Sequence, residues 1–110
     1  MSNKRFENQV AIVTGAGRGI GEAIAKRLAA EGAKIAVVSR TESNSARTAD
    51  AINALAPDTA KPYAVDVADF DAVQKAGDQI LADFGRCDIL VNNAGITRDT
   101  LAMQIGRAHV

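Results

Sequence analysis

The sequence has 110 residues, of which 47% are hydrophobic, with 13 basic and 13 acidic side chains, one cysteine and no tryptophan. This length and apolar content suit one globular domain at most, and the balanced charge argues against a nucleic-acid or membrane-surface partner, which would require a basic patch. A single cysteine, Cys87, excludes an internal disulfide framework and fits a reducing compartment, so we expect a cytoplasmic protein. The apolar runs are far shorter than the roughly 20 residues of a membrane span.

Short apolar runs rich in β-branched residues alternate with alanine-rich helical stretches along the chain. The pattern predicts strands at residues 9–14, 34–39, 62–66 and 88–92, and helices at residues 19–31, 43–56 and 70–84. In the first helix, Ile20, Ile24 and Leu28 recur at helical spacing and are expected on one apolar face. The continuously apolar strands are typical of a sheet covered by helices on both faces. Right-handed crossovers then give an α/β fold of the doubly wound Rossmann type, with parallel strands in the order 3-2-1-4 and the fourth strand at an open edge.

A glycine-rich turn lies where the first strand leads into the first helix, with the sequence Thr14-Gly15-Ala16-Gly17-Arg18-Gly19-Ile20-Gly21. In a doubly wound sheet the ligand lies at the carboxyl ends of the strands, and a glycine turn there presents backbone N–H groups and the positive end of a helix to an anion. The spacing fits neither the six-residue dinucleotide fingerprint nor a P-loop. It matches Thr-Gly-x-x-x-Gly-x-Gly and predicts a pyrophosphate site.

The end of the second strand indicates which nucleotide binds. A free 2′-hydroxyl is usually held by an acidic residue at this position, whereas a 2′-phosphate favours arginine. Here the strand ends in Ser39-Arg40-Thr41, and no acidic residue precedes Glu42. Because Arg18 in the turn can approach the same phosphate, the sequence favours NADP(H) over NAD(H).

Two further motifs follow later strands. Asp66 and Val67 come after the third strand, where the Asp66 carboxylate can accept a hydrogen bond from the adenine amino group; the alternative is that Asp66 caps the next helix, a role that Asp69 can also fill. The fourth strand ends in Asn92-Asn93-Ala94-Gly95, where small residues allow close approach to a ribose or nicotinamide. The asparagine amides are expected to tie this strand to Thr14.

This combination resembles the N-terminal half of the short-chain dehydrogenase/reductase family, of the NADP-preferring type, over residues 7–104. The run Asn-Asn-Ala-Gly-Ile-Thr-Arg-Asp-Thr-Leu at 92–101 is most similar to the 3-oxoacyl-[acyl-carrier-protein] reductases. The resemblance implies that residues 15–18 and Ile20 line the pyrophosphate and the adenosine phosphate, and that Arg40 lies at the adenosine ribose. It also implies that Asp66 and Val67 contact the adenine and residues 93–95 the nicotinamide.

The family's chemistry rests on a serine and a Tyr-x-x-x-Lys pair beyond the fifth strand. The only tyrosine here is Tyr63, with Val67 four residues later, so Tyr63 is interpreted as a packing residue. We therefore expect these 110 residues to lack reductase activity. The whole protein is expected to be an NADPH-dependent reductase of 3-oxoacyl thioesters in fatty acid biosynthesis.

Two alternatives for the function stay open. One is a dehydrogenase of the same family that acts on a sugar, polyol or steroid alcohol, and the other is a non-catalytic NADP(H) sensor. The resemblance implies a homotetramer and a small-molecule or acyl-carrier-protein-bound substrate. No nucleic-acid or membrane partner is expected.

The last six residues, 105–110, depart from the family pattern. They can be encoded by a sequencing adapter, so we expect residues 1–104 to be a partial Rossmann domain and residues 105–110 a non-native tail. A divergent natural tail is the alternative. His109, the only histidine, is discounted as a catalytic or metal-binding residue for this reason, and no metal site is expected.

Overall fold

The computed structural model describes residues 5–66 and 68–93. Strands and helices alternate through this part of the chain, in the order β1 (Val10–Thr14), α1 (Gly19–Ala30), β2 (Lys34–Ser39), α2 (Glu42–Leu55), β3 (Ala60–Ala64), α3 (Phe70–Phe84) and β4 (Ile89–Asn92). All strand pairings are parallel, and the sheet has the order β3-β2-β1-β4. The predicted α/β class and strand order are confirmed, with β4 paired to β1 alone among the described strands.

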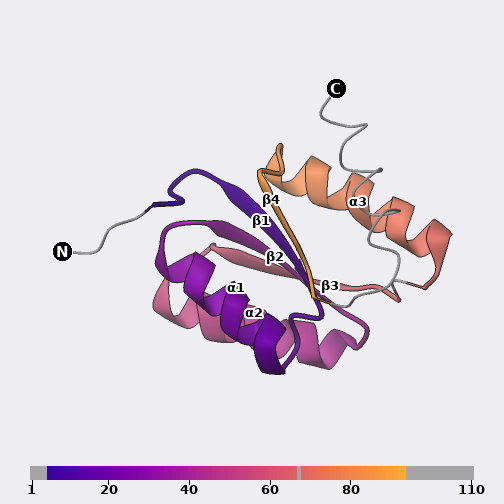
Figure 1. Ribbon diagram of the computed structural model, residues 1–110, viewed down its shortest axis with the longest axis horizontal. Coiled ribbons are helices and arrows are strands. Elements are labelled where there is room, and N and C mark those ends of the chain that lie inside the picture. The colour runs from indigo at the N-terminus through magenta and orange to yellow at the C-terminus, as the bar shows by residue number, and fades with distance from the viewer. Residues whose placement is uncertain (1–4, 67, 94–110) are drawn as a thin grey trace.

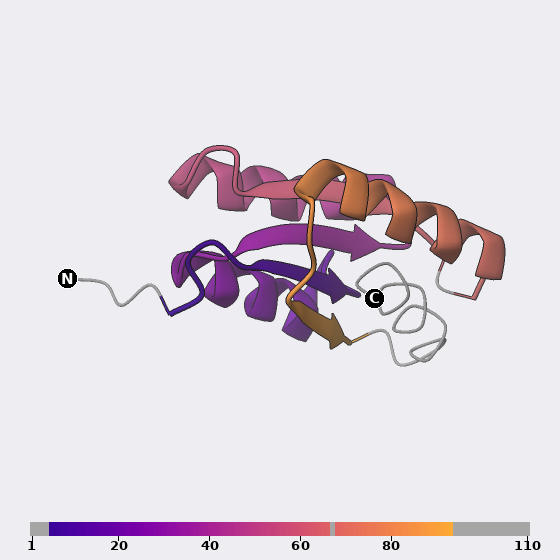
Figure 2. The same cartoon turned by 90° about the horizontal axis from the view of Figure 1, so that it is seen from above.

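The sheet forms the middle of three layers. Figure 1 shows α1 and α2 on one face and α3 on the other, and Figure 2 shows the strands running in one direction between them. Successive residues of the central strands point to opposite faces, so Val13 and Val37 pack toward α1 and α2 while Ile12 and Val38 pack toward α3. Both faces of β1 and β2 are therefore buried, as their unbroken apolar sequence predicts.

The third strand begins two residues earlier than predicted, at Ala60 rather than Pro62, and ends at Ala64. The side chain of Asn53, near the end of α2, fixes this start. Its Oδ1 accepts hydrogen bonds from the backbone N–H groups of Thr59 and Ala60 at 2.9 and 2.8 Å, and its Nδ2 donates to the Ala60 carbonyl at 2.9 Å. Pro62 is tolerated inside the strand because β3 lies at the edge of the described sheet, where a missing N–H on the outer side costs nothing.

The first helix differs from the prediction in its first turn. Ile24 and Leu28 pack against the core cluster beneath α1, but Ile20 is 73% exposed. The three residues belong to one helix as predicted, but only Ile24 and Leu28 reach the core. The residues that precede it in the turn include Gly15, Gly17 and Gly19, which have no side chains with which to cover it.

The N-terminal segment is held to the end of α1 by a buried carboxylate. Glu31 is only 8% exposed and accepts hydrogen bonds from the guanidinium of Arg5 and, at 2.8 Å, from Nε of Arg27. The backbone N–H of Phe6 also donates to the Glu31 carbonyl at 2.9 Å. The two guanidinium hydrogen bonds lower the pKa of Glu31 to about 2 from its ordinary value of 4.5.

We expect the contribution of this cluster to stability to depend on pH. Because the folded-state pKa of Glu31 lies below the unfolded-state value, the stabilisation is complete above about pH 4.5 and is lost as the pH falls towards about 2. Glu31→Gln should therefore lower the urea midpoint at pH 7, and its difference from the parent chain should vanish near pH 2. The exposed Glu7→Gln serves as the control, with no expected change. A difference between Glu31→Gln and the parent that is the same at all pH values would contradict this account.

Candidate functional site

The predicted site residues that the structure describes gather at the carboxyl ends of the parallel strands. Thr14 ends β1 and lies opposite Asn92 of β4 in the sheet register. The Thr14 hydroxyl donates a hydrogen bond to Oδ1 of Asn92 at 2.9 Å. Nδ2 of Asn93 donates to the carbonyl of Gly15 at 3.4 Å. The predicted link between the asparagines and the end of β1 is thus confirmed, and it brings the glycine turn and the end of β4 together.

The glycine turn needs its glycines for two separate reasons. Gly15 and Gly19 have φ values of 63° and 62°, which residues other than glycine rarely adopt. At Gly21 the constraint is space, because a Cβ atom there would lie 2.1 Å from the carbonyl oxygen of Gly15. A Cβ at Gly17 would lie 2.6 Å from Cβ of Asn44 in α2. The turn is therefore packed between the starts of α1 and α2.

The turn and the start of α1 fit an anionic group. Arg18 is the N-cap residue of α1 and provides no side-chain hydrogen bond to the helix. The first N–H groups of a helix have no acceptor within the helix, and the helix dipole adds positive potential there. Ala16 uses its own N–H for the Val38 carbonyl, at 2.9 Å, which anchors the turn to β2. A dinucleotide pyrophosphate fits these donors, and Gly21 allows the start of α1 to pack closely against the Gly15 carbonyl of the turn.

The two predicted arginines belong to this turn and to the end of β2. Arg18 is inside the turn and Arg40 directly follows β2, and both are exposed. Ser39, the last residue of β2, lies against the turn, because a Cβ at Gly17 would be 3.0 Å from the Ser39 Cβ. Arg40 thus follows a residue that contacts the turn. Neither arginine faces an acidic residue at the end of β2, since Ser39 occupies that position.

Asp66 lies beyond the end of β3. It is exposed, and its Oδ1 accepts a hydrogen bond from the backbone N–H of Ala68 at 3.0 Å. Asp69 is the N-cap of α3 and accepts from the N–H of Ala72 at 3.2 Å, so the capping role belongs to Asp69 and not to Asp66. The other predicted site residues, Val67, Ala94 and Gly95, lie outside the described residues, as does the tail 105–110 with His109.

The structure adds two residues that the sequence reasoning missed. Arg47, on α2, donates from Nη2 to the carbonyl of Gly17 at 2.5 Å. The same nitrogen lies 3.8 Å from Oε1 of Glu22, in the first turn of α1. Thirty residues separate Arg47 from Gly17, so no local pattern signals the contact. It depends on how α2 packs against the turn.

The remaining polar side chains of interest have structural roles. The Tyr63 hydroxyl donates to Oδ2 of Asp83 on α3 at 2.6 Å, and burial, together with this carboxylate, raises the pKa of Tyr63. Tyr63 thus packs between β3 and α3, as interpreted from the sequence. Cys87 is buried, and burial raises the pKa of its thiol, which makes it an unreactive packing residue.

Within residues 5–66 and 68–93, no group of three or more His, Cys, Asp or Glu side chains is placed to hold a metal ion. Among the helices of this part of the chain, none has the length and apolar character needed to cross a membrane.

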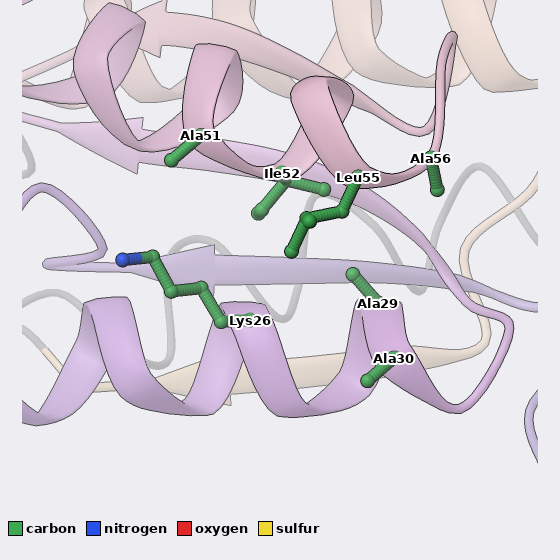
Figure 3. A pocket seen from close by; sticks show the side chains of 7 residues that line it. All are labelled: Lys26, Ala29, Ala30, Ala51, Ile52, Leu55 and Ala56. Carbon is green, nitrogen blue, oxygen red and sulfur yellow. The ribbon is translucent and has the colours of Figure 1, made fainter.

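A cavity of about 390 Å³ lies between α1 and α2, at the ends of these helices opposite the glycine turn (Figure 3). Its walls are mostly alanine methyl groups, with Ile52, Leu55 and the stem of Lys26. Because it lies at the carboxyl ends of α1 and α2, it is separate from the site at the carboxyl ends of the strands.

The close contact at Gly21 leads to a prediction about stability. Gly21→Ala places a methyl group against a backbone oxygen that cannot turn aside, so we expect a loss of roughly 3 kcal/mol in the free energy of unfolding. Gly19→Asn is the matched control in the same turn. A Cβ there meets nothing within 4 Å, and asparagine tolerates a positive φ, so its cost should stay below about 1 kcal/mol. Urea denaturation of both variants checks the order, and equal losses would contradict the steric explanation.

Comparisons with known proteins agree with this geometry. The family model described as short chain dehydrogenase matches residues 9–109. The 3-oxoacyl-[acyl-carrier-protein] reductase FabG of Escherichia coli (strain K12) is 44% identical over 91% of this chain, which spans only 39% of that protein.

Solved structures show the same similarity. The hydroxysteroid dehydrogenase from Escherichia coli superposes with a TM-score of 0.90 at 27% identity, covering 96% of this chain and 50% of that chain. A metagenomic short-chain oxidoreductase in complex with NADP superposes with a TM-score of 0.77 at 41% identity, covering 83% of this chain and 41% of that chain. This chain therefore belongs to the short-chain dehydrogenase family.

Proposed function

We propose that this chain is the NADP(H)-binding half of a reductase that acts on 3-oxoacyl thioesters. The observation that carries the proposal is the glycine turn at the uncapped start of α1, tied to the end of β4 through Thr14 and Asn92. Its backbone N–H groups would hold the pyrophosphate. Bound NADPH would supply the hydride for carbonyl reduction.

The choice of NADP(H) rests on charge at the end of β2. Arg18 in the turn and Arg40 directly after β2 are both exposed, and Ser39 stands where an acidic residue would hold a free ribose 2′-hydroxyl. Two guanidinium groups would bind a 2′-phosphate by charge-assisted hydrogen bonds. Asp66 would accept a hydrogen bond from the adenine amino group, and Asn93 would lie toward the nicotinamide.

The substrate class is supported by the similarity to the Escherichia coli 3-oxoacyl-[acyl-carrier-protein] reductase. A second candidate is a dehydrogenase of a steroid or similar alcohol, which the structural likeness to a hydroxysteroid dehydrogenase supports. In either case the whole protein would carry the catalytic serine and Tyr-x-x-x-Lys pair of the family. This sequence contains no Tyr-x-x-x-Lys pair. We propose a homotetramer for the whole protein, as the family resemblance implies.

Cofactor choice is tested by fluorescence titration of the chain with NADPH and with NADH. We expect the chain to bind NADPH more tightly than NADH. Arg40→Ser should lower the affinity for NADPH by about 10-fold or more, the usual contribution of a charge-assisted hydrogen bond, and should leave the affinity for NADH unchanged. Lys75→Ser removes an exposed positive charge on α3 and should change neither affinity. Equal affinities of the parent chain for the two nucleotides would refute the assignment of NADP(H).

The separation of binding from chemistry gives another test. Because the sequence holds no Tyr-x-x-x-Lys pair, the 110-residue chain should bind NADPH without oxidising it when an acetoacetyl thioester is added. Absorbance of the reduced nicotinamide measures the rate of NADPH oxidation. A rate with the chain present that exceeds the rate without protein would contradict this expectation.

A further inference from the structure

Arg47 links the three segments that surround the proposed pyrophosphate site. It belongs to α2, its Nη2 donates to the carbonyl of Gly17 in the turn at 2.5 Å, and the same atom lies 3.8 Å from Glu22 of α1. A single side chain of α2 thus contacts both the turn and the start of α1. The side chain is 60% exposed, so its role is local to this contact rather than to the core.

The hydrogen bond controls the direction of one peptide group of the turn. The carbonyl of Gly17 and the N–H of Arg18 belong to the same peptide, and in a planar trans peptide these groups point in opposite directions. When Arg47 holds the Gly17 carbonyl toward α2, the N–H of Arg18 is directed away from α2. Arg47 thereby helps to fix the donor pattern of the turn before any ligand binds.

The charge of Glu22 favours the position of the Arg47 guanidinium beside the Gly17 carbonyl. Glu22 also pairs with Lys26, with Nζ and Oε2 2.8 Å apart, and the pKa of Glu22 is lowered chiefly by its hydrogen bond to Lys26 and further by the charges of Lys26 and Arg47. The carboxylate therefore stays ionised at neutral pH and attracts the Arg47 guanidinium from the side of α1. Arg18 and Arg40 are also exposed, and they are suited to meet a phosphate.

We propose that Arg47 is a positioning residue for the glycine turn, acting on the pyrophosphate shared by both nicotinamide dinucleotides and not on the 2′-phosphate. This inference rests on the proposed nucleotide binding. It assigns a role to a residue of α2 that lies outside the glycine motif. A guanidinium is suited to this role because it can bind the Gly17 carbonyl while it faces the Glu22 carboxylate.

The experiment compares three ligands on the full 110-residue chain and on Arg47→Ala. The ligands are NADPH, NADH and adenosine 2′-monophosphate, which carries the 2′-phosphate but no pyrophosphate, each titrated by calorimetry. We expect Arg47→Ala to lower the affinities for NADPH and NADH by the same factor, about 3- to 10-fold for a hydrogen bond from a partly exposed charged group. The affinity for adenosine 2′-monophosphate should stay unchanged. Arg47→Lys keeps a cationic donor and should recover part of the loss.

Other results would overturn the proposal. A loss for NADPH and adenosine 2′-monophosphate with NADH unchanged would make Arg47 a contact of the 2′-phosphate. A loss for all three ligands, together with a lower thermal midpoint, would make its role one of general stability. Unchanged binding of every ligand would mean that Arg47 has no role in the turn. If the parent chain binds none of the ligands, the proposed nucleotide site itself fails, which is a separate outcome.

Local order provides an independent measurement. Amide hydrogen exchange of residues 16–22 should accelerate in Arg47→Ala, because the turn loses its support from α2, while exchange in β1 and α3 should stay the same. Arg40→Ser is the matched control, since it removes an exposed arginine beside the same turn that has no hydrogen bond to the Gly17 carbonyl. It should leave exchange in the turn unchanged.

Discussion

The close approach of the first helix to the turn that precedes it is the constraint on which the site depends. At Gly21 the backbone of α1 lies so near the carbonyl of Gly15 that a Cβ atom would be 2.1 Å from it. This contact sets the direction in which α1 leaves the sheet and leaves its first N–H groups accessible at the carboxyl end of β1. The other features of the site, including the arginines and the asparagines, are arranged around that helix start.

The fourth strand is held beside the first at both of its ends. At the amino end, Asp88 accepts a hydrogen bond from the N–H of Val10 at 2.8 Å through its carboxylate and donates one from its own N–H to the Val10 carbonyl at 2.9 Å. At the carboxyl end, the Thr14 hydroxyl bonds to Asn92. Because β4 pairs only with β1 among the described strands and is half-buried, these polar contacts add to the four residue pairs of the ladder in fixing its register. The register in turn sets the position of Asn93 against the glycine turn.

Most of the fold followed from local features of the sequence, and its failures have physical reasons. The helix predicted at residues 70–84 is confirmed with Asp69 as its cap, because capping depends on residues close together in the sequence. The predicted start of β3 was wrong because the side chain of Asn53, from α2, binds the backbone at Ala60 and so extends the strand toward its amino end. Ile20 has the helical spacing of Ile24 and Leu28 but stays exposed, because its glycine neighbours in the turn have no side chains to cover it.

Residue type and spacing over a few positions are enough to predict the alternation of strands and helices, the glycine turn and the two arginines near it. That Arg47 reaches the carbonyl of Gly17, and that Glu22 faces it from α1, depends on tertiary packing. These residues lie in two different helices, and they meet only because both helices pack on the same face of the sheet. A contact made by such packing has no local signal, since its distance depends on the arrangement of whole elements rather than on the residues beside it.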